Sequence, residues 1–216
     1  MEVLEKSVVV PESVIYCDMD GVLVNFEAGT LDLLNSLLAG GSIPGAKRNK
    51  RYFYLLGKLQ NELGKDFRVE SQADLNLKPI RNFMFYVIGL NPGGFFGSLP
   101  PLLDGVSELW LFLVSTGHVV NILSAPVRGN GEAEGGTAEQ GKRRWAEEYL
   151  SPPPAEVIVL PAVQKPEFAV TNGVPNILID DKVSTITAWN ERGGVGILHV
   201  PGESSLSIGE LESLGL

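Results

Sequence analysis

The sequence predicts an α/β protein in which helices cover both faces of a parallel β-sheet and a small, mainly helical unit is inserted after the first strand. Four short apolar runs, at residues 14–17, 118–123, 157–160 and 176–179, are typical of strands buried on both faces. Stretches with helical spacing separate most of these runs. Residues 42–97 depart from this alternation, which indicates that they form the inserted unit.

Helices of the sheet-containing part are predicted from periodicity and from the residues that end them. The helix at 25–39 is predicted by five apolar residues at helical spacing, and Gly40-Gly41 ends it. Further helices are predicted at 105–115, 138–150 and 182–192. Thr137 and Gln140 have the spacing of a capping box, which places the start of the second of these helices.

The remaining stretches are predicted to be less regular. Residues 1–12 are expected to be a loose lead-in, and the glycine-rich stretch 128–136 a mobile surface loop. A last strand is predicted at 195–200. The tail from Pro201 is predicted to form at most one or two helical turns.

The inserted stretch 42–97 combines a basic cluster with aromatic residues. Helical periodicity is predicted for 47–63 and is weaker for 80–88, and Asn91-Pro92-Gly93-Gly94 is expected to mark the exit. We therefore predict a core domain made of 1–41 and 98–216 and a cap domain at 42–97. The basic cluster consists of Lys47, Arg48, Lys50 and Arg51, and the aromatic candidates for stacking on a planar group are Tyr52, Phe53, Tyr54, Phe83 and Phe85.

Composition limits the classes of function. Of the 216 residues, 44% are hydrophobic and 20% charged, as in ordinary soluble proteins, and no apolar run approaches the length of a membrane span. The start of the chain lacks the features of a secretory signal, and Cys17 alone cannot form a disulfide, so a cytoplasmic location is expected. A net charge of −9 argues against binding to long nucleic acid. A homodimer remains an open alternative.

Polar side chains follow three of the predicted strands: Asp18 and Asp20 after the first, Ser124 after the second, and Asp180-Asp181 after the fourth. The carboxyl ends of parallel strands meet at one edge of a sheet, where open α/β sheets bind ligands. Residues two apart on an extended segment point the same way, so Asp18 and Asp20 can face one volume. The alternative to a ligand site is that Asp18 and Asp20 belong to a turn and that their carboxylates are solvated.

Several carboxylates in one place require a cation, and oxygen ligands without a Cys/His cluster favour Mg²⁺. Such a site attracts a phosphoryl group, whose charge also needs a hydroxyl donor and a cationic side chain. Ser124 supplies the hydroxyl donor. The leading candidate for the cationic side chain is Lys165, which lies in a segment at 161–171 that is predicted to be non-helical. The alternatives are that Lys165 is a solvated loop lysine and that Lys142 serves the phosphate. His118 and His199 are expected to be packed or surface residues.

The order of these motifs resembles the haloacid dehalogenase superfamily: Asp-x-Asp-Gly-Val after the first strand, Ser after the second, a Lys, then paired Asp. The resemblance covers roughly residues 13–200. Within the superfamily, the stretches DMDGVLVNFEAG, ILSAPV, KRRWAEEYL and NILIDDK are similar to those of the 5′(3′)-deoxyribonucleotidases.

The resemblance implies a role for each site residue. Asp18 would be the nucleophile that forms an aspartyl-phosphate, and Asp20 the acid that protonates the leaving oxygen and then activates water. Mg²⁺ would be held by Asp18, the backbone carbonyl of Asp20 and Asp180, with Asp181 in or just behind that shell. Ser124 and Lys165 would bind the phosphoryl group. Phe26 would line the nucleoside pocket; its alternative is a core position on the first helix.

The expected function is Mg²⁺-dependent hydrolysis of a phosphomonoester, with a nucleoside monophosphate as the small phosphorylated substrate. The cap would limit water and select the leaving group. Three alternatives remain: a phosphatase for another small phosphate ester, one for a terminal phosphate of a nucleic acid, and a non-catalytic module that binds phosphate.

Overall fold

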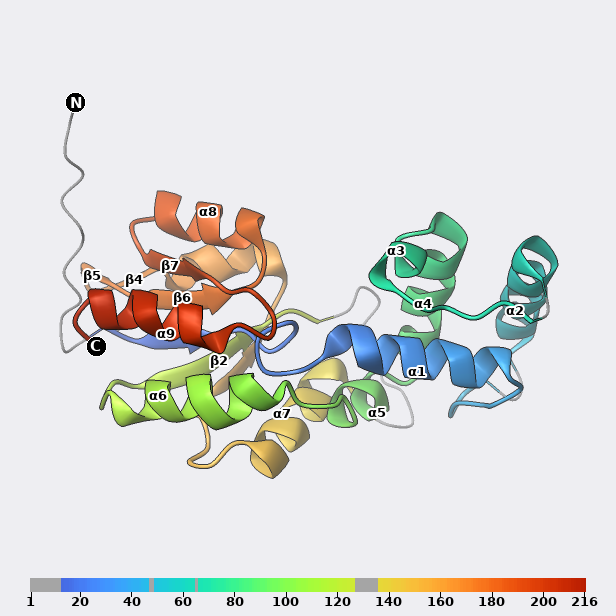
Figure 1. Cartoon of the computed structure of the whole chain (residues 1–216), viewed down its shortest axis with the longest axis horizontal. Helices are drawn as coiled ribbons and strands as arrows, with labels where there is room; N and C mark the ends of the chain where they lie inside the picture. The colour runs from blue at the N-terminus through green and yellow to red at the C-terminus, as the bar shows by residue number, and fades with distance from the viewer. Residues whose placement is uncertain (1–12, 47–48, 65, 127–135) are drawn as a thin grey trace. The chain divides into compact units, whose positions relative to one another are not determined.

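The computed structural model describes residues 13–46, 49–64, 66–126 and 136–216 (Figure 1). The predicted lead-in at 1–12, the basic residues Lys47 and Arg48, and all of the predicted 128–136 loop except Gly136 lie outside these ranges. The chain divides into two compact units. The first contains Met1–Asn25, Pro101–Ala125 and Ala146–Leu216, and the second contains Phe26–Pro100 and Pro126–Trp145.

A five-stranded parallel sheet forms the centre of the first unit. Its order is β3-β2-β1-β6-β7, so the strand that precedes Asp18 is flanked on both sides. Cys17 pairs with Ile122 of β2 on one side and with Ile179 of β6 on the other. The strands are β1 (Ile15–Cys17), β2 (Val120–Ser124), β3 (Val157–Val159), β6 (Ile177–Asp180) and β7 (Val195–Leu198).

The first unit also contains helices and a small hairpin. A π-helical turn, η1 (Gly105–Leu109), continues directly into α6 (Trp110–Ser115). Helix α8 (Val183–Glu191) contacts β6 and β7, and α9 (Ser204–Ser213) contacts β7 and η1. Between β3 and β6 lie the 3₁₀-helix η2 (Ala162–Phe168) and the antiparallel hairpin of β4 (Val170–Thr171) and β5 (Val174–Pro175).

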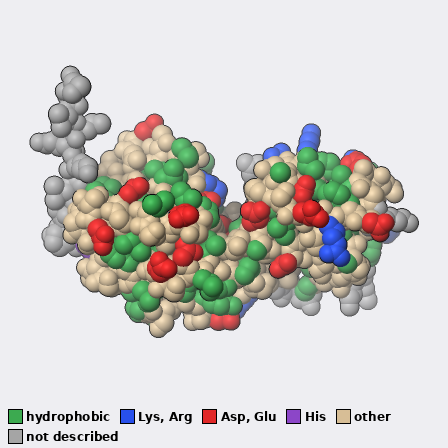
Figure 2. Space-filling view, in the orientation of Figure 1, with side chains coloured by type: hydrophobic (Ala, Val, Ile, Leu, Met, Phe, Trp, Pro, Cys, Tyr) green, Lys and Arg blue, Asp and Glu red, His purple; other side chains and the backbone are tan. Residues whose placement is uncertain are grey.

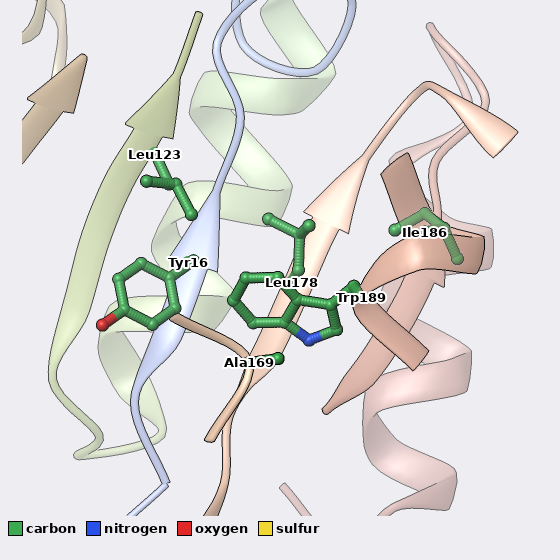
Figure 3. Close-up of a cluster of buried hydrophobic side chains, with 6 residues drawn as sticks. All are labelled: Tyr16, Leu123, Ala169, Leu178, Ile186 and Trp189. Carbon is green, nitrogen blue, oxygen red and sulfur yellow. The ribbon is translucent and has the colours of Figure 1, made fainter. Parts of the chain in front are cut away.

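One cluster of buried apolar side chains joins the sheet to α8 and to the segment that follows η2 (Figure 3). The rings of Tyr16 and Trp189 meet edge to face with centroids 5.7 Å apart, and Phe168 contacts Tyr16 in the same way at 5.6 Å. The cluster consists of Tyr16, Leu123, Ala169, Leu178, Ile186 and Trp189. It therefore fixes η2 and α8 on the sheet whose strands lead to Asp18, Ser124 and Asp180.

The second unit is helical. Tyr52 of α2 (Lys50–Leu63) and Phe83 of α4 (Lys78–Leu90) are buried against each other with ring centroids 6.0 Å apart. Helix α7 (Ala138–Tyr149) runs across the division between the units at Trp145, and its start is capped reciprocally by Thr137 and Gln140. The other helices are α1 (Phe26–Leu38), α3 (Gln72–Leu75) and α5 (Pro92–Gly97).

The predicted fold class is confirmed: the parallel sheet has helices around it, and mainly helical chain follows its first strand. The boundaries predicted for the cap stay a prediction. Over the described ranges, no helix combines the length and apolar character needed to cross a membrane.

Three local predictions are wrong. The segment predicted to be non-helical at 161–171 contains η2, and Asn91 begins a helix rather than an exit loop, because its side chain caps Gly94 N–H and Pro92 occupies the first turn. The tail forms the ten-residue helix α9, whose start is bonded to Asp104, one hundred residues earlier in the chain.

Candidate active site

Asp18 lies directly beyond the central strand and is buried. Its backbone N–H donates to the Ile179 carbonyl at 2.9 Å, which extends the pairing of β1 with β6 by one residue. Its carboxylate Oδ1 accepts a hydrogen bond of 2.7 Å from the Met19 N–H. The side chain is thus fixed by the sheet on one side and by the turn that follows it on the other.

Asp180 is the last residue of β6 and is fully buried. Its Oδ1 accepts a hydrogen bond of 2.8 Å from the Lys182 N–H, and its Oδ2 lies 2.7 Å from the Lys165 Nζ. Burial, and then the nearby Asp18 carboxylate, raises the pKa of Asp180 despite the opposing effect of Lys165.

Lys165 comes from η2 and is buried, with 1% of its surface exposed. Its Nζ lies 3.0 Å from Asp18 Oδ2 and 2.7 Å from Asp180 Oδ2. Burial acts to lower the pKa of Lys165, but the two carboxylates outweigh it and raise the pKa above its usual value. Lys165 is therefore an ammonium ion that joins the ends of β1 and β6, and the alternative of a solvated loop lysine is excluded.

Asp181 completes a group of three carboxylates. Asp18, Asp180 and Asp181 each offer an oxygen, and these ligand atoms all lie within 4.8 Å of one another. Burial raises the pKa of Asp181 to about 6, with the neighbouring acids adding to the effect and Lys182 opposing it. The Lys182 Nζ lies 3.8 Å from Asp181 Oδ1.

These residues fit a divalent cation. The three donors are hard oxygen atoms, the ligands that Mg²⁺ prefers. Within the described chain, Asp181 Oδ1 is buried and receives no hydrogen bond, so it has an acceptor position to offer. Lys165 and Lys182 bring two positive charges to three carboxylates, which leaves one negative charge for a cation to balance.

Asp20 and Gly21 lie in the tight turn after β1. Three successive N–H groups, those of Val22, Leu23 and Val24, donate to the Met19 carbonyl, and Asp20 is half-buried. Gly21 has φ +80°, and a Cβ at this position would lie 2.5 Å from Asp181 Oδ2. Glycine is therefore required both by the backbone conformation and by the close approach of Asp181.

Ser124 is the last residue of β2 and is fully buried. Ile122 pairs with Cys17, so Ser124 belongs to the sheet edge at which Asp18 and Asp180 lie. Its carbonyl accepts from the Leu160 N–H at 3.0 Å, which joins the end of β2 to the end of β3. The predicted convergence of three strand ends on one edge is thus present in the first unit.

Phe26 and Lys142 belong to the second unit. The Phe26 ring begins α1 and meets the Phe95 ring edge to face at 5.6 Å. Lys142, the alternative phosphate ligand, is buried on α7, with its Nζ 4.3 Å from the centre of the Phe96 ring. The pocket role of Phe26 stays a prediction.

The remaining candidates have structural contacts. His118 Nδ1 lies 2.9 Å from the Ser13 carbonyl, and the buried His199 Nδ1 lies 2.9 Å from Ser207 Oγ. Burial raises the pKa of the Cys17 thiol well above its usual range, so this residue is poorly suited to act as a nucleophile.

Asn176 has a structural role that the sequence analysis does not predict, since the sequence shows it only as the start of the strand at 176–179. Its fully buried side chain accepts from the Val14 N–H at 2.9 Å and donates to the Phe168 carbonyl at 2.7 Å and to Thr171 Oγ1 at 2.8 Å. It connects the beginning of β1 to the chain that leaves η2. The feature of the sequence that could have indicated this role is a polar amide side chain at the start of an apolar strand.

Comparison of the sequence with protein-family models and with curated proteins finds no match. Among solved structures, the chain is similar to a haloacid dehalogenase-like family hydrolase from Xanthomonas campestris, with 11% identity, 96% of each chain covered and a TM-score of 0.52. A phosphonoacetaldehyde hydrolase-like protein from Oleispira antarctica has 14% identity over all of this chain and 82% of that one, with a TM-score of 0.42.

At this level of identity, the similarity to the Xanthomonas hydrolase establishes the fold, and the site must be argued from its own residues. The chain has the haloacid dehalogenase-like fold, with a parallel sheet and a cluster of acidic residues at its carboxyl edge.

Proposed function

We propose that the protein is a Mg²⁺-dependent phosphomonoesterase that forms a covalent intermediate on Asp18. The observation that carries this proposal is the position of Lys165 Nζ, which lies within 3.0 Å of Asp18 and 2.7 Å of Asp180 beside a group of three carboxylates. A buried carboxylate next to a fixed ammonium and a cation site is suited to attack on a phosphoryl group that carries negative charge.

In the proposed reaction, an Asp18 oxygen forms a bond to phosphorus while the bond from phosphorus to the ester oxygen breaks. Asp20 gives its proton to that leaving oxygen. Asp20 then takes a proton from a water molecule, whose oxygen attacks the aspartyl-phosphate. The bond from phosphorus to Asp18 breaks, inorganic phosphate leaves, and Asp18 and Asp20 regain their starting states.

Asp18, Asp180 and Asp181, with the backbone carbonyl of Asp20, would hold the cation. When bound, Mg²⁺ neutralises phosphoryl charge and orients the group for in-line attack. Lys165 would balance the charge of Asp18 in the free enzyme and that of the phosphoryl oxygens in the complex. Ser124 would donate its hydroxyl to the same group.

The proposed substrate is a nucleoside monophosphate. Support for this finer assignment is the resemblance of the motif stretches to the deoxyribonucleotidases, including Phe26 six residues after Asp20. Phe26 is half-buried and packs on the buried rings of Phe95 and Phe96, so it is the ring of this group that is placed to pack against a base.

The first experiment is hydrolysis of p-nitrophenyl phosphate with Mg²⁺ by the parent protein and by Asp18→Asn. We expect turnover in the parent, its loss on chelation of the metal, and a loss of at least about a thousandfold in the variant. Absence of turnover in the parent would favour the alternative that the protein is a non-catalytic module that binds phosphate. A panel of nucleoside monophosphates and sugar phosphates then separates the proposed substrate class from other small phosphate esters.

A further inference from the structure

Helices α2 and α4 of the second unit pack side by side in antiparallel directions. At one end, the Tyr86 hydroxyl donates to Asn49 Oδ1 at 2.8 Å, and the Arg51 guanidinium lies 5.0 Å from the centre of the Tyr86 ring. In the middle, the rings of Tyr52 and Phe83 pack together. The two helices thus present one continuous surface, which we call the α2/α4 surface.

The α2/α4 surface is basic in a protein that is acidic overall. Its two helices contain five Lys or Arg residues, all exposed, and one acidic residue, Glu62. By sequence, the second unit has 13 Lys and Arg against 9 Asp and Glu, and the first unit has 4 against 17. The net charge of −9 is therefore the sum of a positively charged second unit and a strongly negative first unit. Figure 2 shows basic side chains of the second unit among hydrophobic and acidic ones. The five cations are Lys50, Arg51, Lys58, Lys78 and Arg81.

Aromatic side chains are interleaved with these cations. Phe53, Tyr54 and Phe85 are 55%, 69% and 43% exposed, whereas Tyr52 and Phe83 on the same helices are buried in the unit. Lys50, Tyr54 and Lys58 recur every four residues and so lie along one face of α2. Arg81 and Phe85 have the same spacing on α4. Exposed rings beside cations at this density are typical of a binding surface.

A groove of about 180 Å³ lies between the two helices. Its apolar lining includes Leu55, Leu59 and Phe83, and Lys58 and Lys78 stand among its lining residues. Lys58 is 3.7 Å from Glu62, an exposed pair whose coupling is weak. The groove offers room for a flat apolar group next to positive charge.

We propose that the α2/α4 surface binds single-stranded nucleic acid. Such strands combine a regularly charged backbone with flat bases, and proteins bind them by pairing cations with phosphates and stacking bases on aromatic rings. An acidic peptide would satisfy the cations alone, and a duplex keeps its bases stacked inside, so neither uses the exposed rings of Tyr54 and Phe85. The proposal concerns a short strand held by the second unit and requires no phosphate hydrolysis.

The test is fluorescence anisotropy with a labelled strand of about twelve thymidines that carries no terminal phosphate, so that the carboxylate site has no substrate. We expect binding to the full-length chain that weakens steeply with salt, by a log–log slope of about −2 to −3 for three or four phosphate contacts. Competition by the unlabelled strand excludes binding through the dye. Phosphatase activity is assayed separately, so either result stands without the other.

Variants then assign the binding to the surface. Tyr54→Ala and Phe85→Ala are each expected to weaken binding about tenfold with an unchanged salt slope. Lys78→Ala is expected to lower the magnitude of the slope by about 0.7. Arg143→Ala, an exposed cation on α7, and Leu206→Ala, an exposed apolar residue on α9, are the matched controls and should bind like the parent.

Three results would overturn the proposal. The first is no binding at about 100 μM protein in low salt. The second is equal affinity for an acidic peptide of the same net charge, which would assign the surface to a protein partner. The third is binding that survives both aromatic substitutions, with circular dichroism confirming that the variants are folded.

Discussion

Lys165 Nζ lies 2.7 Å from Asp180 Oδ2, and the same nitrogen lies 3.0 Å from Asp18 Oδ2. One buried ammonium therefore holds together the carboxylates that follow two neighbouring parallel strands. Its backbone belongs to a connecting segment rather than to the sheet, so the site depends on how that segment is anchored.

Removing this ammonium should destabilise the protein strongly. Lys165→Ala leaves Asp18 and Asp180 buried without their shared cation, and we expect the free energy of unfolding to fall by about 3–5 kcal/mol. Urea unfolding in a metal chelator measures this change. Lys58→Ala removes an exposed ion pair with Glu62 and should cost less than about 0.5 kcal/mol. Equal costs for the two variants would mean that the Lys165 contacts add no stability.

Asn176 is expected to position Lys165. Its side chain donates to Phe168, at the end of η2, and accepts from Val14, at the head of β1. Asn176→Ala should cost about 2–4 kcal/mol through three lost hydrogen bonds and should raise the KM for phosphate esters more than it lowers kcat.

The matched control for that variant is Asn35→Ala. Asn35 holds a loop through two similar bonds to the backbone of Val69, in the second unit. It should lower stability without the selective rise in KM. Asn176→Asp keeps the acceptor toward Val14 and loses the donors toward η2, so it should reproduce the KM effect if the η2 contact is responsible.

Gly21 is expected to tolerate no side chain. An added Cβ would meet Asp181 Oδ2 at 2.5 Å, whereas Gly40 has a similar φ of +91° with no atom within 4 Å of its Cβ position. Both alanine variants should lose about 1–3 kcal/mol from backbone strain. Gly21→Ala alone should weaken Mg²⁺ binding, measured by calorimetric titration. Equal metal affinity in the two variants would place Asp181 outside the cation site.

Asp104 should make stability depend on pH. Burial acts to raise the pKa of Asp104, but hydrogen bonds of 2.8 and 3.0 Å from the Ser204 hydroxyl and N–H outweigh it and lower the pKa. A lowered folded-state pKa means that the pair stabilises the fold above the ordinary value of about 4, and that this contribution is lost as the pH falls through the folded-state pKa.

We therefore expect Asp104→Asn to cost about 1 kcal/mol at neutral pH, as for loss of a helix cap, and progressively less below about pH 4. Thermal unfolding of the parent and the variant from pH 7 downward measures how the difference in their stability shrinks. Glu108→Gln, an exposed carboxyl in η1, should show no such trend. A constant difference at every pH would contradict the role given to the ionised Asp104.

The strand ends were predictable from the sequence because each one joins a local apolar run to local polar residues. Parallel pairing then brings Asp18, Ser124 and Asp180 to one edge without further information. The position of Lys165 could be proposed only from the order of the motifs, because it depends on η2 and on Asn176, eleven residues further along the chain.

Other features depend on contacts that no local pattern contains. Helix α9 is weakly amphipathic, and its start is bonded to Asp104 from a distant part of the chain, so its length was underestimated. The exposure of Phe53 and Tyr54 beside the buried Tyr52 depends on how α2 packs on α4. The net charge of the whole chain likewise does not reveal that the two units have net charges of opposite sign.

The most direct test of the central claim is to identify the atom that receives the phosphoryl group. The protein is mixed with a phosphomonoester and Mg²⁺, quenched in acid within the first turnover, digested, and examined by mass spectrometry. The proposed mechanism predicts a phosphorylated peptide modified at Asp18, which is absent from Asp18→Asn and from samples with chelated metal. Turnover with the phosphoryl group on another residue, or with no covalent intermediate at all, would contradict it.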